Sequence, residues 1–472
     1  MKSEFTSLTT ALILAALAAF NSAATAAQPT DPGIRRAPTD NGPPTPLAGL
    51  DQDEREYFQD GLSRFATVEV VSGAGPGQGN GLGPRFNSES CLSCHAQPNA
   101  GGSSPAQNPL ASIATAYGAA NDMPWFIASA GPIREARFIQ SNGTADGGVH
   151  DLFVVSGRSD AGSCALSQPA FGPAGNPVTG QGGNRNIVFR IPTPVFGAGL
   201  IEAIADSTIL ANMSNNADSN ARFGVHGHAN AIQGGNVNRS GNDGTITRFG
   251  WKAQNKSLLM FAGEAYNVEM GISNQLFPQE RTETAACRTY NSTPEDTNNF
   301  SQTTTANSGT PVLSDIEAFA NFMRMLAPPA PGPSSPLTIY GKTLFVQVGC
   351  ATCHTPTLMT GTAISTGSSR NPSPALSGQP ANLYSDLLLH HMGQGLADGI
   401  TQAAAGPDEF RSAPLWGLGQ RAYFLHDGRT SDLLVAIEAH RSQGSEANAV
   451  IAQYNGLSSA QQQAILDFLR SL

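Results

Sequence analysis

Apolar side chains recur every three or four residues in three segments of the chain, and each segment begins with a capping-box pattern. The three boxes are Asp51 with Glu54, Ser314 with Glu317, and Ser458 with Gln461. The apolar residues that follow are Tyr57, Phe58, Leu62 and Phe65, then Phe319, Met323 and Leu326, then Ile465, Phe468, Leu469 and Leu472. The pattern predicts three amphipathic helices in a mainly α fold with extensive irregular loops.

Proline-rich stretches divide the chain between these helices. Residues 327–336 cannot form a continuous helix because of their prolines, which predicts a linker. It would separate an N-terminal domain, residues 49–326, from a C-terminal domain, residues 337–472. Residues 27–48 have a similar composition and are expected to form a flexible leader.

The middle of the chain is expected to be largely irregular. With 51 Gly and 32 Pro among 472 residues, much of the chain must form turns and loops. One strand is predicted over residues 187–191, and the Gly- and Asn-rich residues 211–244 are expected to form surface loops. The formal charge of -10 disfavours nucleic acid or an anionic membrane as a partner.

The N-terminus has the organisation of a secretory signal peptide. Lys2 precedes an apolar run over residues 8–20, and Ala24-Thr25-Ala26 fits a cleavage site. The run is too short to span a membrane, although a retained anchor is the alternative. We expect cleavage near Ala26, a signal peptide over residues 1–26, and a periplasmic or secreted protein without a membrane anchor.

Two pentapeptides carry the strongest chemical signal: Cys91-Leu92-Ser93-Cys94-His95 and Cys350-Ala351-Thr352-Cys353-His354. In such a motif the two thiols add to the vinyl groups of one haem, and the histidine ligates the iron. A bare Cys-x-x-Cys pair could be a redox dithiol or half of a zinc site, but the adjacent histidine in both copies argues against both. We therefore expect two covalently bound c-type haems, with His95 and His354 as iron ligands. Both domains would be cytochrome c-like, the N-terminal one enlarged by a long insertion with a few short strands.

The two remaining cysteines, Cys164 and Cys287, are expected to pair. Covalent haem attachment takes place outside the cytoplasm, where disulfides form and persist. Two free buried thiols are the alternative.

The second axial ligand of each iron remains open on the residues alone. For the C-terminal haem the candidates are Met392 and His440. For the N-terminal haem they are His150, His226 and His228, or no protein group at all. An iron without a second protein ligand could bind peroxide or dioxygen, whereas two protein ligands favour electron transfer alone.

Five further segments are distinctive: Thr247-Arg248-Phe249-Gly250-Trp251-Lys252-Ala253-Gln254, Asn267-Val268-Glu269-Met270-Gly271, Ser385-Asp386-Leu387-Leu388-Leu389-His390, Pro414-Leu415-Trp416-Gly417-Leu418-Gly419 and His426-Asp427-Gly428-Arg429. Together they resemble the di-haem oxidoreductase family, whose members are labelled thiol oxidoreductases or peroxidases. That family is related to the bacterial di-haem cytochrome c peroxidases and, more remotely, to the maturation enzyme MauG and the rubber oxygenases.

The resemblance implies roles for three residues. In the peroxidases a ligand of the C-terminal haem follows the histidine of a Phe-His-Asp-Gly segment by fourteen residues, a position that His440 occupies here. A bis-His iron with His354 and His440 is therefore preferred over Met392. Trp251 matches a tryptophan that relays electrons between the haems, and Glu269 matches a glutamate that moves protons of bound peroxide. Core packing of Trp251 and an ion pair of Glu269 are the alternatives.

The sequence departs from the peroxidases at two places. Leu259 or Phe261 stands where they have a glutamine upstream of the glutamate, and His391 stands where the family has an aspartate. A calcium ion lies between the domains of the peroxidases, but no compact carboxylate cluster in this sequence supports one.

The resemblance implies an enzyme that reduces hydrogen peroxide at the N-terminal haem. Electrons would come from a small cytochrome or cupredoxin and pass through the C-terminal haem. One alternative is a di-haem electron-transfer protein without substrate chemistry, and another is a MauG- or rubber-oxygenase-like oxidase of an organic or protein substrate. The thiol oxidoreductase label has little support, because Cys164 and Cys287 do not form a C-x-x-C motif.

Overall fold

The structure of the protein is a computed structural model. It describes residues 28–37, 40, 42–116, 123–141, 144–145, 148–168, 171, 186–231, 246–279, 287, 296, 313–362 and 372–472. The predicted signal peptide lies outside these residues. Within them, no helix combines the length and the apolar character that crossing a membrane requires.

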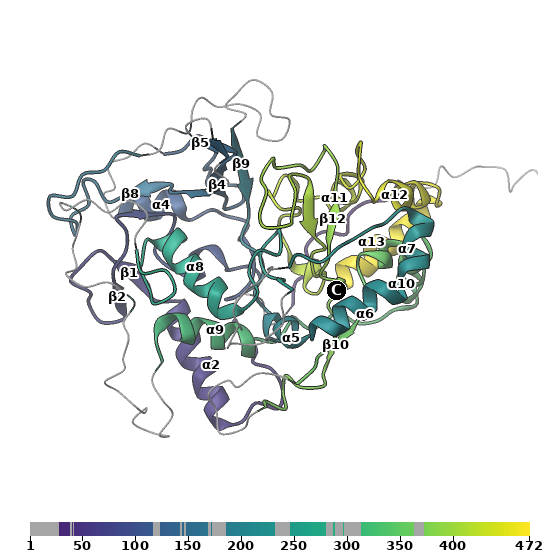
Figure 1. Ribbon diagram of the computed structural model, residues 1–472, viewed down its shortest axis with the longest axis horizontal. Coiled ribbons are helices and arrows are strands. Elements are labelled where there is room, and N and C mark those ends of the chain that lie inside the picture. Colours follow the sequence, from purple (N-terminus) through teal and green to yellow (C-terminus); the bar gives the residue numbers. More distant parts are fainter. Residues whose placement is uncertain are drawn as a thin grey trace, which may run out of the picture.

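Helices dominate the described part of the chain (Figure 1). They are α2 (Gln52–Phe65), α3 (Cys91–Cys94), α4 (Leu110–Ala116), α5 (Ala198–Ala203), α6 (Asp206–Asn215), α7 (Ala217–Phe223), α8 (Leu258–Met270), α9 (Asp315–Met325), α10 (Pro336–Gln347), α11 (Leu433–Glu438), α12 (Asn448–Asn455) and α13 (Ser459–Ser471), with the 3₁₀ helices η2 (Cys350–Thr352) and η3 (Leu418–Gln420).

The strands are short and form small ribbons. They are β1 (Val68–Val70), β2 (Gln78–Asn80), β3 (Arg85–Phe86), β4 (Glu135–Phe138), β5 (Gln140–Ser141), β6 (Thr144–Ala145), β7 (Val149–His150), β8 (Phe153–Val154), β9 (Ile187–Arg190), β10 (Leu358–Met359), β11 (Pro380–Ala381), β12 (Leu389–His391) and β13 (Glu409–Arg411). The largest sheet in the described residues has three antiparallel strands in the order β7-β4-β9, and β1 and β2 pair in parallel. The fold is therefore helix-rich with a few short strands, as predicted at that level.

The three predicted capping boxes are confirmed. At the start of α2, the Glu54 backbone N–H donates to Asp51 Oδ1 at 2.9 Å, and the Asp51 N–H donates to Glu54 Oε2 at 3.0 Å. Reciprocal boxes also begin α9 and α13. Each box satisfies backbone N–H groups that a helix start leaves without partners.

Two pairs of helices form the frame around the two halves of the chain. In the N-terminal half α2 packs on α9, and in the C-terminal half α10 packs on α13 (Figure 1). A glycine permits each close approach: a Cβ at Gly61 would overlap the Ala318 carbonyl, and a Cβ at Gly341 would overlap the Ala464 carbonyl.

The buried apolar residues form two main cores. The larger gathers α2, α8 and α9 together with Leu383, Leu387 and Leu388 from the C-terminal half. The smaller is built from α10, α11 and α13. The division into two domains stays a prediction, and α10 begins at Pro336, one residue inside the predicted linker.

One expectation differs from the structure. Residues 211–244 were expected to form surface loops, but α6 and α7 extend to Phe223, and residues 232–244 lie outside the described residues. The flexible leader stays a prediction; within it, Asp31 forms an ion pair with Arg470 of α13 at 2.6 Å.

Candidate functional site

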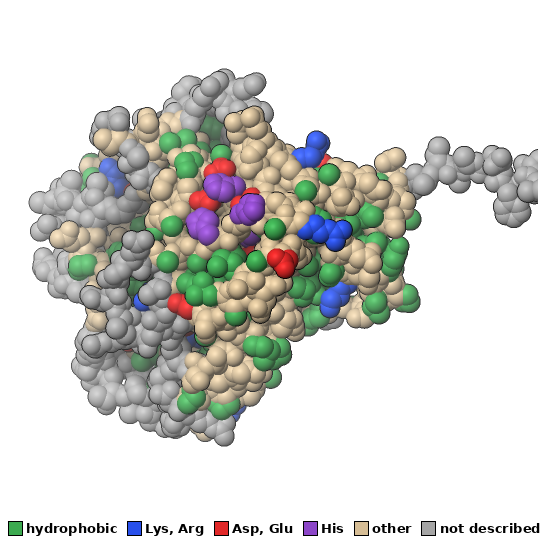
Figure 2. Space-filling model, turned by 45° about the vertical axis from the view of Figure 1, so that its right-hand side comes forward, with side chains coloured by type: hydrophobic (Ala, Val, Ile, Leu, Met, Phe, Trp, Pro, Cys, Tyr) green, Lys and Arg blue, Asp and Glu red, His purple; other side chains and the backbone are tan. Residues whose placement is uncertain are grey.

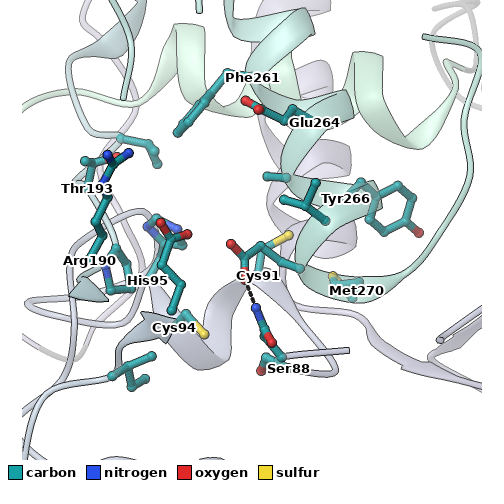
Figure 3. Close-up of a pocket in the computed structure, with 18 of the residues that line it drawn as sticks. Ser88, Cys91, Cys94, His95, Arg190, Thr193, Phe261, Glu264, Tyr266 and Met270 are labelled. Carbon is teal, nitrogen blue, oxygen red and sulfur yellow. Dashed lines mark hydrogen bonds between the residues drawn. The ribbon is translucent and has the colours of Figure 1, made fainter. Parts of the chain in front are cut away.

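The first Cys-x-x-Cys-His motif forms one side of a cavity. Cys91 and Cys94 lie on α3, where the Ser90 side chain accepts from a backbone N–H and caps the helix. His95 follows, with its Nδ1 3.0 Å from the Gly102 carbonyl oxygen. Since a carbonyl can only accept, Nδ1 donates to it, and a further backbone hydrogen bond to Thr193 engages the imidazole. Figure 3 shows both cysteines and this imidazole at the cavity.

The second motif repeats the arrangement in a second cavity, lined by Cys350, Cys353 and His354. The His354 Nδ1 lies 3.0 Å from the Tyr384 carbonyl oxygen and donates to it. Burial, and then the nearby His440, lower the pKa of His354 to about 4. The imidazole is therefore neutral at neutral pH, as a metal ligand must be.

His440 lies in the second cavity, as the family resemblance implies. It follows α11, and its Nδ1 donates to the Ala436 carbonyl at 2.8 Å, which leaves the Nε2 lone pair for a metal. Burial lowers its pKa. Met392 lines the same cavity, so the choice of His440 as axial ligand stays a prediction.

The other histidines that line the second cavity have different surroundings. His390 is held by carboxylates, with Asp386 3.0 Å from Nε2 and Glu446 3.0 Å from Nδ1. His426 stacks on the Phe410 ring with centroids 4.2 Å apart, and burial lowers its pKa to about 4. His390 is thus engaged at both nitrogens, which an iron ligand cannot be.

None of the histidine candidates for the first haem lines the first cavity. His150 lies on β7, and the Nε2 of His228 is 2.7 Å from Glu409. The His226 backbone N–H donates to Glu446, near the second cavity. Figure 2 shows histidine and acidic side chains gathered on one face of the molecule. Among the described residues that line the first cavity, His95 is the only histidine.

A pair of carboxyl groups faces the first motif. Glu269 lies on the last turn of α8 and Glu135 begins β4, and both line the first cavity. Asn87 Nδ2 donates to Glu269 Oε2 at 2.6 Å, and Arg137 Nε lies 2.5 Å from Glu135 Oε1. A hydrogen bond joins the two carboxyl groups.

The two carboxyl groups differ in pKa. Burial, followed by the charge of Glu135, raises the pKa of Glu269 well above its usual value. Burial also acts to raise the pKa of Glu135, but the charge of Arg137 and hydrogen bonds outweigh it and lower the pKa. The surroundings therefore favour a proton on Glu269 and a negative charge on Glu135, beside Arg137.

Trp251 lies between the cavities and lines both of them. Its Nε1 donates to the Ile191 carbonyl at 2.8 Å, and the Ile191 N–H donates to the His426 carbonyl at 2.7 Å. The rings of Trp251 and His426 meet edge to face, with centroids 6.4 Å apart. The position of Trp251 between the haems and its role in electron transfer stay predictions.

Both cavities have the donor groups to hold a haem. Their empty volumes are about 1200 and 1370 Å³, including space open to solvent. Figure 3 shows Phe261, Glu264 and Met270 of α8 across the first cavity from Arg190 and Thr193.

Buried polar atoms at both cavities fit the two carboxylates of a haem. Arg190 Nε at the first cavity and Arg421 Nε at the second are donors without a hydrogen-bond partner among the described residues. Burial lowers the pKa of Arg411 and Arg421, both at the second cavity, to about 10. A propionate would compensate such buried positive charge, so the residues fit the group.

Sequence reasoning missed Glu135, Arg137 and Arg190. The available signal was the spacing of Glu135 and Arg137, which places both side chains on one face of a strand. In the antiparallel pairing of β4 with β9, Glu135 stands directly opposite Arg190. This strand pairing brings Glu135, Arg137 and Arg190 to the first cavity. The sequence does not reveal it. Gln254, which also lines the cavity, was missed. Phe261, one of the two candidates for the place of the family's glutamine, lines it as well.

The expected pairing of Cys164 with Cys287 is confirmed, since the two form a disulfide. Within the residues that the structure describes, no group of three or more His, Cys, Asp or Glu side chains is arranged to hold a metal ion. The calcium ion of the peroxidases therefore gains no support from the described carboxylates.

Comparison with known proteins gives one informative match. A family model described as "Di-haem oxidoreductase, putative peroxidase" matches residues 183–472, more than half of the 472-residue chain. The match includes the second haem motif, Trp251, Glu269 and His440, and begins after the first motif. No curated protein matches the chain.

A solved structure of hydrazine synthase from Kuenenia stuttgartiensis, pressurized with 20 bar xenon, is similar at 12% identity, covering 66% of this chain and 99% of that one. Its TM-score of 0.26 is too low for the likeness to inform the fold or the function.

Proposed function

The chain belongs to the di-haem oxidoreductase family, and from this premise we propose that it is a periplasmic peroxidase with two covalently bound c-type haems. Hydrogen peroxide would be reduced at the first cavity, and electrons would enter at the second. The proposed attachment residues are Cys91 and Cys94 with His95, and Cys350 and Cys353 with His354. His440 would be the second axial ligand at the second cavity.

One observation carries the proposal, the unequal supply of imidazoles. In the second cavity two histidines, His354 and His440, present Nε2 lone pairs, and each is fixed by an Nδ1 hydrogen bond to a carbonyl. In the first cavity His95 has no histidine opposite it among the described lining residues. An iron with two imidazoles favours electron transfer, and an iron with one can bind a small substrate.

The side chains around the first cavity supply the proton chemistry. Reduction of one peroxide to two waters consumes two electrons and two protons. When bound, the haem supplies the iron that binds peroxide and the electrons that reduce it. Glu269 holds a proton at a buried carboxyl oriented by Asn87, and it gives this proton to the leaving oxygen, which eases cleavage of the O–O bond.

Trp251 supports an electron path between the cavities. It is the aromatic side chain that lines both, and its hydrogen bond to Ile191 fixes the indole. The proposed donor is a small cytochrome or cupredoxin that docks near the second cavity. The chain's charge of -10 suits a basic donor.

The direct test is peroxide turnover by the holoprotein with a reduced small cytochrome as donor. We expect two haems per chain, donor oxidation that depends on peroxide, and slower reduction of the first haem in Trp251→Phe. Trp125→Phe is the matched control, because Trp125 lines neither cavity. Two haems that stay low-spin and do not react with peroxide would show that the protein is an electron carrier and not a peroxidase.

A further inference from the structure

The first cavity contains a second carboxyl group whose function neither the family match nor the sequence comparison assigns. Glu135 comes from β4, far in sequence from Glu269 on α8, yet both line the cavity and share a hydrogen bond. Two buried carboxyl groups in contact cannot both ionise without strong repulsion. Such pairs occur where one group must give a proton and the other take one.

The surroundings make the two groups unequal. Arg137, two residues along the same strand, pairs with Glu135 at 2.5 Å, and Arg190 stands opposite Glu135 on β9. On the other side, the Asn87 amide donates to Glu269 at 2.6 Å. The side-chain oxygen of Asn87, Oδ1, accepts from the Leu152 backbone N–H at 2.7 Å, which fixes the direction of the side-chain amide. The cations thus lie on the Glu135 side, and the proton resides on Glu269.

We propose that Glu135 and Glu269 act as one proton-transfer unit, in which ionised Glu135 takes a proton from peroxide while Glu269 gives its proton to the leaving oxygen. The proposal rests on the proposed peroxidase function. The O–O bond breaks, the leaving oxygen departs as water with the proton of Glu269, and the oxygen that stays has lost its proton to Glu135. Two electrons from the external donor and two protons from solvent convert the remaining oxygen to the second water. Transfer of the proton from Glu135 to Glu269 across their hydrogen bond restores the starting protonation of the pair.

The first test needs no turnover. In the resting holoprotein with ¹³C-labelled glutamate, the infrared carboxylic C=O band reports protonated glutamate and excludes haem propionates. Burial also raises the pKa of Glu69, to about 8, so the comparison is made in a Glu69→Gln background. We expect a C=O band from Glu269 at neutral pH, and this band should be absent in Glu269→Gln. In Glu135→Gln the titration midpoint of the band should move to lower pH.

The change in midpoint has a stated cause. Glu135→Gln removes the negative charge beside Glu269 and leaves Arg137 to act on it. The charged or titratable groups facing the pair are Arg137, Arg190 and the Cys94 thiol, which forms a thioether when haem is attached. Glu264→Gln is the matched control: this glutamate lines the same cavity from α8 but bonds to Asn255, so its loss should leave the midpoint unchanged. An unchanged midpoint in Glu135→Gln overturns the shared proton.

The second test is kinetic. In Glu135→Gln, kcat/KM for peroxide should fall roughly ten- to a hundredfold and lose its dependence on the ionisation of Glu135, with haem content and resting spectrum preserved. Glu135→Asp should restore part of the rate. If Glu135→Gln fails to bind haem, kcat/KM for peroxide is measured in Glu135→Asp and Arg137→Gln instead. Full wild-type turnover in Glu135→Gln overturns the relay while leaving the peroxidase standing. A wild-type protein with the infrared band but no peroxide turnover refutes the proposed function instead.

Discussion

The two cavities begin from the same Cys-x-x-Cys-His motif and differ in what stands across from it. Opposite His354 lies a second imidazole, His440, among apolar and aromatic side chains. On the wall of the His95 cavity lies the hydrogen-bonded pair Glu135 and Glu269. Under the proposed function, the attachment motif would fix where a haem is held, and the facing elements would decide which chemistry it can support.

The difference follows from which elements close each cavity. A helix and the turn after it, ending at His440, close the second, and the backbone carbonyl of Ala436 orients the ring. A helix and a strand, α8 and β4, close the first and bring carboxyl groups from distant parts of the chain. The following substitutions test this contrast in order of expected effect.

Replacing His440 by Ala should have the largest effect, because it removes one of the two imidazoles of the second cavity. We expect the low-spin signal of that haem to convert completely to high spin in electron paramagnetic resonance and visible spectra. His440→Met should stay low-spin with a raised reduction potential. Met392→Leu is the control and should stay low-spin. If Met392→Leu converts to high spin while His440→Ala stays low-spin, Met392 is the axial ligand instead of His440.

Replacing Glu269 by Gln should remove the proton that the first cavity supplies. We expect kcat for peroxide to fall by about 10²–10⁴, with both haem spectra retained. Glu56→Gln, on α2 outside both cavities, should leave kcat near the wild-type value. Wild-type turnover in Glu269→Gln would leave this carboxyl without a part in the reaction.

The pH dependence of stability should reveal the buried acids of the N-terminal half. Burial, and then the charge of Asp315, raise the pKa of Glu69 to about 8, and the Tyr266 hydroxyl donates to it at 3.3 Å. A raised carboxyl pKa gives stability that is present below the unfolded value and is lost as pH rises through about 8. A tenfold change in an acid dissociation constant corresponds to about 1.4 kcal/mol, so the free energy of unfolding should fall by a few kcal/mol.

Urea denaturation at several pH values measures this slope. Glu69→Gln should flatten it, and Asp218→Asn, at an exposed position of α7, should leave it as in the wild type. If the free energy of unfolding depends on pH as steeply in Glu69→Gln as in the wild type, groups other than Glu69 control the pH dependence of stability.

The two helix crossings allow the halves to be compared directly. Gly61→Ala and Gly341→Ala each place a methyl group against a facing backbone carbonyl, and each should cost about 1–3 kcal/mol. Gly131→Ala, where the nearest atom is 3.8 Å away, should change stability by less than about 0.5 kcal/mol. Differential scanning calorimetry would show whether each variant lowers the unfolding temperature of its own half of the protein first. If neither variant is destabilised, the close approach of the helices is contradicted.

The sequence predicted features that depend on short-range patterns. The capping boxes of α2, α9 and α13 follow from residues three apart, and the haem motifs from five consecutive residues. The strand predicted over 187–191 is present as β9, one residue shorter. These features are encoded locally, so no tertiary contact is needed to recognise them.

Features that depend on distant contacts were missed. The Glu135 and Glu269 pair requires β4 and α8 to meet, and the ion pair of Asp31 with Arg470 joins opposite ends of the chain. The helices α6 and α7 extend to Phe223, into a Gly- and Asn-rich stretch whose composition favours loops. His440 was identified through family resemblance, since its spacing alone left Met392 equally open.

The most direct test of the central claim is electron paramagnetic resonance of the oxidised holoprotein with and without hydrogen peroxide. The unequal cavities predict one low-spin haem that peroxide leaves unchanged and one high-spin haem whose signal changes when peroxide is added. Two low-spin signals, both insensitive to peroxide, would contradict the division of labour between the cavities.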